Sequence, residues 1–282
     1  MKDTHRFKIG SFQCLLVNDG GRIGSAGMLF ANAPQEQLQL ALQRSGLEAD
    51  HLPSTWSCLL VKTADHLLLV DTGYGPGSDA GGQLMPLLQA EGIQPKDIDR
   101  VILTHAHPDH IGGTVDARGK AAFPVAVYYM WHKEWDFWTG EANLVQVPAW
   151  AADFARRKLP PLSAHMRPVD AGTEVVPGIQ ILSAPGHTPG HSVVEISSGD
   201  ETLLFMADVA LHPLQIEFPQ WTSRLDLDPQ QTVATRHKIY QRAVENKALV
   251  LAFHFHPFPS LGYITGQEGR WHWEPWTLQV AE

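Results

Sequence analysis

The 282-residue sequence predicts a fold of the α+β class in which layers of β-sheet are covered by helices. Short runs rich in Val, Ile and Leu, with turn residues between them, predict strands, and helical segments are interspersed among these strands. A chain of this length can bury a sizeable core without disulfide bonds. Since no low-complexity tract or linker divides the sequence, we expect a single domain over residues 1–282.

Each strand is expected where an apolar run lies between two turns. In chain order the strands are 12–18, 57–62, 66–71, 100–104, 124–129, 179–183, 192–197, 202–207 and 248–254. Helices are expected at 34–45, which Gly46 ends, at 81–91 and at 230–246. Residues 20–55 are an insertion-like stretch, and we expect them to form a lid or a dimer contact.

The chain contains a weak internal repeat. The segments SCLLVKTADHLLLVD and SVVEISSGDETLLFMAD each read as strand, tight turn and strand, and they end in Asp71 and Asp208. A loop, an amphipathic helix and an apolar strand follow each Asp, and this strand ends in His105 or in His254. Either two common strand–turn–strand units coincide, or two β-rich halves face each other and gather Asp and His residues at matching strand ends.

The composition restricts what the protein binds. With 21 basic and 30 acidic residues the net charge is −9, and no run of Lys or Arg offers a surface for nucleic acid or an anionic membrane. No segment has the length of a membrane span and no apolar stretch follows the charged start, so we expect no signal peptide and a cytoplasmic location. Cys14 and Cys58 lie in apolar runs, which predicts buried thiols and excludes a disulfide-rich scaffold and a cysteine zinc finger.

The strongest chemical signal is the segment THAHPDHIGG at residues 104–113, directly after an apolar strand. Imidazole suits zinc and similar metals, and a carboxylate adds the negative charge that holds a second cation. A loop that turns off a strand can direct His105 and His107 to one ion while Asp109 and His110 reach the next. The alternative interpretation is a solvated polar turn.

Further candidates lie at other strand ends. His187, in APGHTPGHS, is the candidate third ligand of the first ion, whereas His191 is expected to support a ligand or to lie in the core. Asp208 ends an apolar strand, where an uncompensated carboxylate is costly, and a position between two cations would compensate its charge. The alternative for Asp208 is a helix N-cap or a turn. His212 either contacts substrate or a ligand carboxylate, or is a solvated or core histidine.

The last ligand is His254 or His256. These residues are two apart, so in an extended strand both point to the same side. His254 closes its apolar strand as His105 closes the matching strand in the repeat, and Pro257 directs His256 away from the sheet. We therefore expect His254 to bind metal and His256 to affect substrate affinity.

Aromatic residues near these motifs have two interpretations. Trp131, Trp135 and Trp138 have the spacing of one helical face, which either packs on the core or forms a wall of the substrate pocket. The same alternatives apply to Trp221, Trp271, Trp273 and Trp276.

The motifs VDTG, THAHPDHIGG and PGHTPGH, followed by an Asp after a strand and a late His, resemble the five motifs of the metallo-β-lactamase superfamily over residues 57–262. The resemblance implies an αββα four-layer sandwich, with two mixed sheets flanked by helices and a binuclear metal site at one edge. The implied ligands are His105, His107 and His187 for the first metal, Asp109, His110 and His254 for the second, and Asp208 for both, with Asp71 as a supporting residue. Two divalent ions are expected; zinc is the default, and iron or manganese suits the same donors.

Other stretches narrow the resemblance to one branch. GSFQCLLVNDG, ADVALHPLQ, TSRLDLDPQQTVATR and AFHFHPFPSLG resemble the branch of acyl-homoserine lactonases, related lactonases and methyl-parathion-type hydrolases. A bridging Asp208 disfavours a true zinc β-lactamase and therefore antibiotic hydrolysis. His107 stands where the flavodiiron pattern has Glu, which disfavours oxygen reduction.

The resemblance therefore implies a binuclear metal-dependent hydrolase of a lactone or related carboxylic ester. A hydroxide between the cations would attack the carbonyl carbon, and Asp109 would protonate the leaving alkoxide. An organophosphate triesterase or a glyoxalase-II-like thioesterase would use the same chemistry. An RNA-processing nuclease is disfavoured by the charge of −9, and a non-enzymatic metal-binding module by the open coordination positions. We expect a small-molecule ester or lactone partner, neither nucleic acid nor membrane, and leave a homodimer open.

Overall fold

Two β-sheets face each other in the computed structural model, which describes residues 3–77, 79–267 and 269–276. The first sheet has the spatial order β1 (Thr4–Ile9), β2 (Phe12–Gly24), β3 (Leu52–Lys62), β4 (Leu67–Val70), β5 (Arg100–Ile102), β6 (Val127–Trp131) and β7 (Met166–Val169). The second has the order β14 (Arg270–Pro275), β13 (Leu261–Gln267), β12 (Leu249–Leu251), β11 (Glu201–Phe205), β10 (Ser192–Ser198), β9 (Ile179–Ser183) and β8 (Glu174–Val176). Parallel and antiparallel pairs occur in both, so the sheets are mixed.

Helices connect and cover these strands. In the described residues the α-helices are α1 (Ala26–Leu29), α2 (Gln35–Arg44), α3 (Leu84–Ala90), α4 (Pro108–Ile111), α5 (His132–Thr139), α6 (Glu141–Leu144), α7 (Ala149–Lys158), α8 (Leu214–Glu217) and α9 (Pro229–Glu245). Short 3-10 turns are η1 (Pro95–Asp97), η2 (Gly112–Thr114), η3 (Pro160–Leu162) and η4 (Ala207–Val209).

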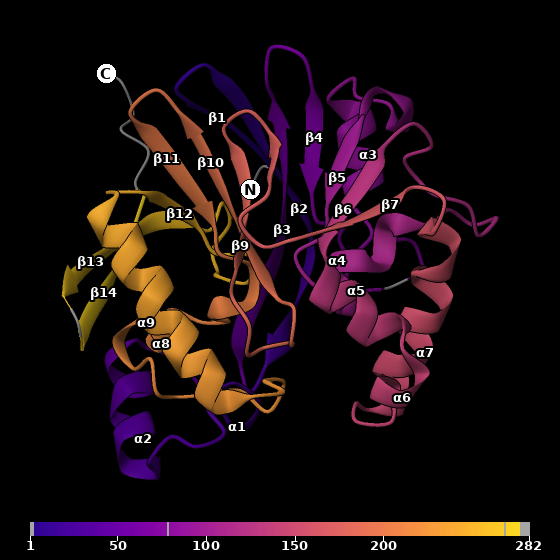
Figure 1. Ribbon diagram of the computed structural model, residues 1–282. Helices are drawn as coiled ribbons and strands as arrows, with labels where there is room; N and C mark the ends of the chain where they lie inside the picture. The colour runs from indigo at the N-terminus through magenta and orange to yellow at the C-terminus, as the bar shows by residue number, and fades with distance from the viewer. Residues whose placement is uncertain (1–2, 78, 268, 277–282) are drawn as a thin grey trace.

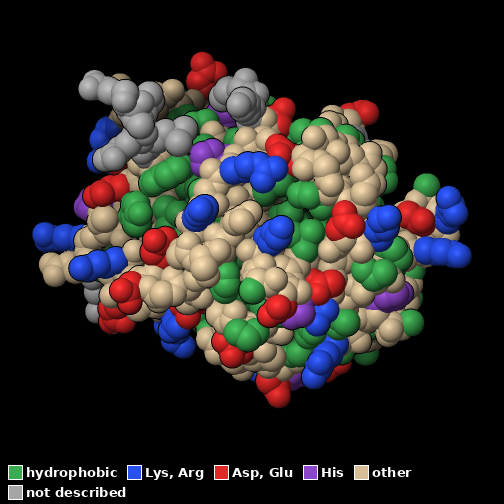
Figure 2. Space-filling view, turned by 90° about the horizontal axis from the view of Figure 1, so that it is seen from above, with side chains coloured by type: hydrophobic (Ala, Val, Ile, Leu, Met, Phe, Trp, Pro, Cys, Tyr) green, Lys and Arg blue, Asp and Glu red, His purple; other side chains and the backbone are tan. Residues whose placement is uncertain are grey.

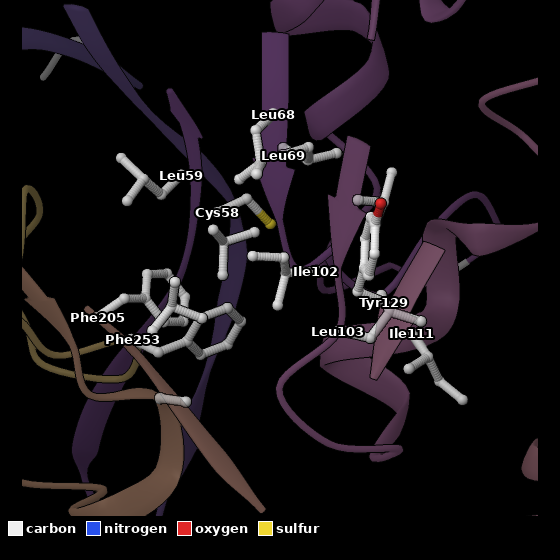
Figure 3. Packing of buried hydrophobic residues seen from close by; sticks show 14 of the residues in the cluster. Cys58, Leu59, Leu68, Leu69, Ile102, Leu103, Ile111, Tyr129, Phe205 and Phe253 are labelled. Atoms are coloured by element: carbon white, nitrogen blue, oxygen red, sulfur yellow. The ribbon is translucent and has the colours of Figure 1, made fainter. Parts of the chain in front are cut away.

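The layers follow the order helix, sheet, sheet, helix. Helices α3 to α7 lie on the outer side of the first sheet, and α9 lies on the outer side of the second (Figure 1). Between the sheets, Phe205 of β11 and Phe253 after β12 lie opposite Cys58 of β3 and Ile102 of β5, and all four are fully buried (Figure 3). The predicted αββα sandwich is confirmed. Central strands are apolar on both faces because a helix layer covers one face and the opposite sheet covers the other.

The internal repeat has the same strand pairing in both halves. β3 pairs with β4 antiparallel and β4 with β5 parallel, and β10, β11 and β12 pair in the same way. The chain also turns alike after β4 and β11, where Asp71 (φ 58°) and Ala207 (φ 46°) have left-handed backbone conformations. Such conformations are costly for residues with a Cβ and persist where the surroundings demand them. Both halves thus bring an Asp to the same edge of the sandwich.

The insertion-like stretch belongs partly to the first sheet. Residues 20–24 and 52–55 extend β2 and β3 into a long hairpin. At its tip, α1 and α2 pack on residues 211–225 of the other half through an apolar cluster. The cluster includes Leu29, Phe30, Leu42, Leu214 and Trp221. A role as lid or dimer contact stays a prediction.

The predicted helical face of three tryptophans is wrong. Trp131 is the last residue of β6 and pairs with Val169 of β7, and Trp135 and Trp138 lie on α5. The run VYYMW forms a strand because its aromatic and β-branched residues suit a sheet that is buried on both faces. Trp138 is buried in the core, as one of the two interpretations expected.

Two other predictions concern burial and membranes. Cys14 and Cys58 are buried free thiols, as expected. Burial raises the pKa of Cys14 to about 12 and the pKa of Cys58 well above its usual value. Among the described helices, none combines the length and the apolar character needed to cross a bilayer.

Candidate metal centre

The structure brings all seven predicted ligands together at one edge of the sandwich, each in a segment that follows a strand. His105 and His107 follow β5, Asp109 and His110 lie in α4, His187 lies between β9 and β10, Asp208 lies in η4, and His254 follows β12. Pro108 is the first residue of α4, where its fixed φ favours the start of a helix. This sharp turn after β5 lets one short segment supply donors to two groups.

The first donor group consists of three histidines and one carboxylate. His105, His107, His187 and Asp208 each contribute one atom to a set in which all atoms lie within 4.8 Å of one another. His187 Nε2 lies 2.9 Å from His107 Nδ1 and 3.2 Å from Asp208 Oδ2, and His105 Nε2 lies 3.7 Å from the same oxygen. Ligands of a tetrahedral zinc ion with bonds of about 2.0–2.1 Å lie about 3.3 Å apart, so the spacing suits one cation.

The second donor group consists of Asp109, His110 and His254, which meet the same limit of 4.8 Å. His254 Nε2 lies 3.6 Å from Asp109 Oδ2. Asp208 also faces this group, because its Oδ1 lies 3.0 Å from His110 Nε2 and its Oδ2 lies 3.2 Å from His254 Nε2. One carboxylate therefore lies between the two groups, in the position predicted for a bridging ligand.

Unsatisfied polar atoms test whether these residues fit metal ions. His105 Nε2 is buried and makes no hydrogen bond within the described structure, and His110 Nε2 and Asp208 Oδ1, which lie 3.0 Å apart, have no hydrogen bond of good geometry either. Leaving buried polar atoms without partners is costly unless another group compensates them. All three belong to the donor groups, and a set of imidazoles and carboxylates suits zinc, iron or manganese. The residues present fit two divalent cations.

Asp71, which the resemblance implied as a supporting residue, holds His110. Its Oδ2 lies 2.7 Å from His110 Nδ1. Thr104 donates its N–H and its Oγ1–H to the two oxygens of Asp71, both at 2.8 Å. The Asp71 carboxylate thereby orients the His110 ring and leaves Nε2 for a cation.

A family model described as the metallo-β-lactamase superfamily matches residues 55–253, which include the complete first donor group and most of the second. The chain belongs to this superfamily. The predicted family and the predicted class of metal-dependent hydrolase are confirmed at this level.

Relatives within the superfamily include lactonases. An N-acyl homoserine lactonase of Bacillus thuringiensis is 25% identical over 226 residues, which cover 70% of this chain and 80% of that protein. The match to an N-acyl homoserine lactonase of Bacillus cereus spans 61% of that protein. The solved structure of AidC, a dizinc quorum-quenching lactonase, has a TM-score of 0.87 and 27% identity and covers 99% of this chain and 100% of that one. The hydrolase AbOPH has a TM-score of 0.91 and 26% identity, with 99% of both chains covered.

Charges around the candidate metal centre favour cation binding. Burial lowers the pKa of His105 and of His107 well below the usual value, so both rings are neutral and free to bind a metal. Burial also lowers the pKa of His110, but the carboxylates of Asp208 and Asp71 outweigh it and raise this pKa well above its usual value. The two carboxylates therefore stabilise positive charge at the position where the second cation is expected.

Asp226 and Arg236 support the ligand His187. Asp226 Oδ1 lies 2.9 Å from His187 Nδ1, and Ser223 N donates to Asp226 Oδ2 at 2.7 Å. Burial lowers the pKa of His187, but hydrogen bonds to Asp208 and Asp226 and their charges raise it to about 9. Arg236 is fully buried and lies 3.9 Å from Asp226, so its charge compensates that carboxylate.

The remaining histidines of the motifs have other places. His191 accepts the Asp208 N–H at Nε2 (3.1 Å), and its Nδ1 donates to Ala184 O (3.0 Å), which fits the expected supporting role. His212 packs against Phe30 in the apolar cluster.

β12 ends at Leu251, so the predicted strand to 254 is too long and strand alternation does not decide where His254 and His256 point. His254 faces the centre, whereas His256 is exposed.

Sequence reasoning missed several residues that hold the centre together. Ser54 Oγ lies 3.1 Å from His254 Nδ1, although the two residues are 200 positions apart. Asp226 and the buried Glu134 were also missed. The available signal for Asp226 was its place in TSRLDLDPQQTVATR, a stretch that contributed to the resemblance. Ser54 and Glu134 lie in no motif, and the contacts that define their roles are distant in sequence.

Proposed function

We propose that this protein is a two-metal hydrolase that opens a lactone or cleaves a related carboxylic ester. The observation that carries the proposal is the position of Asp208, whose carboxylate lies 3.2 Å from His187 in one donor group and 3.0 Å from His110 in the other. The similarity to AidC, described as a dizinc lactonase, and to the Bacillus lactonases supports this substrate class.

Each ligand has a proposed place. His105, His107 and His187 would hold one cation, Asp109, His110 and His254 would hold the other, and Asp208 would contact both. Two bound cations would supply Lewis acidity toward the scissile carbonyl and would lower the pKa of water to near neutrality. Zinc suits this donor set, and iron or manganese would suit it as well.

Asp109 is the residue to which we assign proton transfer to the leaving alkoxide. Its side chain is 15% exposed, whereas the other six candidate ligands are buried. Since its Oδ2 lies 3.6 Å from His254 Nε2, it faces the centre and solvent at the same time. A carboxylate in this place can accept a proton on one side and deliver it to a departing oxygen.

The distribution of charge argues against the nuclease alternative. On the face seen in Figure 2, Lys and Arg side chains are dispersed among Asp and Glu. With a net charge of −9, the chain as a whole offers little attraction for a polyanion. A small, uncharged substrate agrees better with both observations.

The test is a substrate panel on protein reconstituted with zinc. We expect kcat/KM to be highest for an N-acyl homoserine lactone or another γ-lactone, compared with an aryl ester, a phosphotriester such as paraoxon and a thioester. Activity should disappear with a chelator and return when zinc is added. A higher kcat/KM on the phosphotriester or the thioester would overturn the assignment to lactones in favour of that alternative.

A further inference from the structure

Glu134 is a fully buried carboxylate between the two loops that carry the three histidines of the first donor group. It lies on α5, and the four hydrogen bonds of its side chain go to Ala106, Trp138, Thr188 and Gly190 rather than to a proposed ligand atom. Its burial needs an explanation, because a carboxylate away from water is costly unless partners compensate it.

Four donors satisfy the two oxygens of Glu134. Oε1 accepts Ala106 N at 3.0 Å and Trp138 Nε1 at 2.7 Å. Oε2 accepts Thr188 Oγ1 at 2.8 Å and Gly190 N at 2.9 Å. Burial raises the pKa of Glu134, and these four bonds oppose that effect. Ala106 N, Gly190 N and Trp138 Nε1 can only donate, and the Thr188 hydroxyl donates in this arrangement, so the ionised carboxylate accepts from all four groups.

The donors come from both ligand-bearing loops. Ala106 lies between His105 and His107, and Thr188 follows His187. Each oxygen of Glu134 therefore holds one loop, and the carboxylate joins the loop after β5 to the loop between β9 and β10.

Two further contacts place α5 against the same loops. A Cβ at Gly190 would lie 2.1 Å from Glu134 N, so the backbones meet at a distance that requires glycine. The Trp138 ring packs edge-on against His107, with centroids 5.7 Å apart, and Trp138 is itself held by its hydrogen bond to Glu134.

We propose that Glu134 is a positioning residue for the first metal, because it sets where His105 and His107 lie relative to His187. This inference rests on the metal centre proposed above. The carboxylate does not contact the cation; it fixes the two backbones from which three of the four donors of the first group project. Partners behind metal ligands typically change metal affinity by about 10–100-fold.

The test measures metal binding rather than turnover. Glu134→Gln keeps the shape of the side chain, but its NH2 group faces at least one N–H that can only donate, either Gly190 N or the Ala106 N and Trp138 Nε1 pair. We would titrate metal-free protein with Co²⁺ against a chromophoric chelator to obtain both dissociation constants, and follow urea unfolding of the metal-free protein. We expect one dissociation constant to rise about 10–100-fold, which means weaker binding, and the other to change by less than about threefold.

A control and a second background identify the affected group. Ile196→Ala truncates a fully buried side chain on β10 away from the loops, so it should lower stability and leave both dissociation constants unchanged. In a His254→Ala background the first donor group is intact, and Glu134→Gln should there weaken the remaining tight site. If Glu134→Gln does not fold, Thr188→Val removes a single bond and should weaken the same site about 3–10-fold.

The outcomes separate this inference from the proposed centre. If the wild-type protein binds no metal, the proposed centre is wrong and this inference falls with it. If the wild-type protein binds two ions and Glu134→Gln binds both with unchanged affinity while losing stability, Glu134 is merely structural and this inference alone is wrong.

Discussion

Four of the five histidines in the candidate centre have Nδ1 next to a fixed partner and present Nε2 to the cation positions. The partners are Thr104 for His105, Asp71 for His110, Asp226 for His187 and Ser54 for His254. His107 differs, because its Nδ1 faces the centre. Fixing one ring nitrogen decides which tautomer and which orientation the other offers, so the centre is largely arranged before a metal binds.

At Asp208 the decisive property is charge. Asp208→Asn keeps the shape but removes the negative charge between the two donor groups, so two cations would repel each other without compensation. We expect metal content to fall toward one ion per chain and hydrolysis to fall about 100-fold or more, with an unchanged circular dichroism spectrum.

Asp153→Asn is the matched control, because Asp153 is exposed on α7 and should tolerate the change. An Asp208→Asn protein with two metals and near-native turnover would contradict the bridging role.

His254 and His256 form a natural pair for comparison. His254 belongs to the second donor group, whereas His256 is exposed. We expect His254→Ala to lose the second metal and most of the activity, and His256→Ala to keep both metals and to change mainly KM. Elemental analysis of the two purified variants decides the assignment; metal loss in His256→Ala with retention in His254→Ala would reverse it.

At the scale of elements, the long β2–β3 hairpin connects the first half of the chain to the loop after Asp208. Its tip helices pack on residues 211–225 through the cluster around Trp221, and its strand β3 carries Ser54 to His254. We expect that disturbing this contact lowers stability and weakens the support of His254.

Trp221→Ala tests how firmly the hairpin tip is held. Trp221 is 1% exposed and packs on Phe30 and Phe218. Removing the indole leaves a cavity, and we expect the free energy of unfolding in urea to fall by about 3–5 kcal/mol. Trp150→Ala, at a position that is 53% exposed, should change it by less than about 0.5 kcal/mol. Equal effects of the two changes would mean that the cluster contributes little.

At the scale of the whole molecule, both sheets and the four segments that follow β5, β9, β11 and β12 must be in place for the donors to meet. Ions that bind this arrangement and not the unfolded chain stabilise the folded state. At a free metal concentration of 100 times Kd, one site contributes about 2.7 kcal/mol. We expect about two metals per chain by elemental analysis and a lower Tm after removal with a chelator. A stoichiometry near one after reconstitution, or an unchanged Tm, would contradict the two-metal centre.

The buried thiols report on opening of the whole fold. Burial raises the pKa of Cys14 to about 12, and an unfolded thiol has a pKa of about 8.5. The folded state therefore keeps this proton longer, so the associated stabilisation is complete below about pH 8.5 and is lost as the pH rises toward 12. At pH 8 we expect a disulfide reagent to label neither thiol within minutes in native protein and both after unfolding. Rapid labelling of the native protein would show that the core opens readily.

The sequence predicted elements well where burial leaves a local pattern. Strand 179–183 has the predicted bounds, and helix 230–246 is displaced by one residue. Strands β1, β7, β8, β13 and β14 were missed because they lie toward the sheet edges and carry polar residues, which leaves no apolar run. The spacing of Trp135 and Trp138 indicated the helix α5, but its start was placed wrongly because its residues follow directly on the apolar strand β6.

The sequence by itself determined the family, the sandwich and the seven donor candidates. Those donors follow strands in short motifs, so local spacing carries the information and the β5 loop alone supplies four of them. Tertiary structure decided what holds them. Ser54, Asp226 and Glu134 act across 200, 39 and 28 or more positions, through contacts that exist only once the sheets and α5 are packed. A single buried polar residue leaves no period and no motif in a sequence, because its role is defined by partners that folding brings to it.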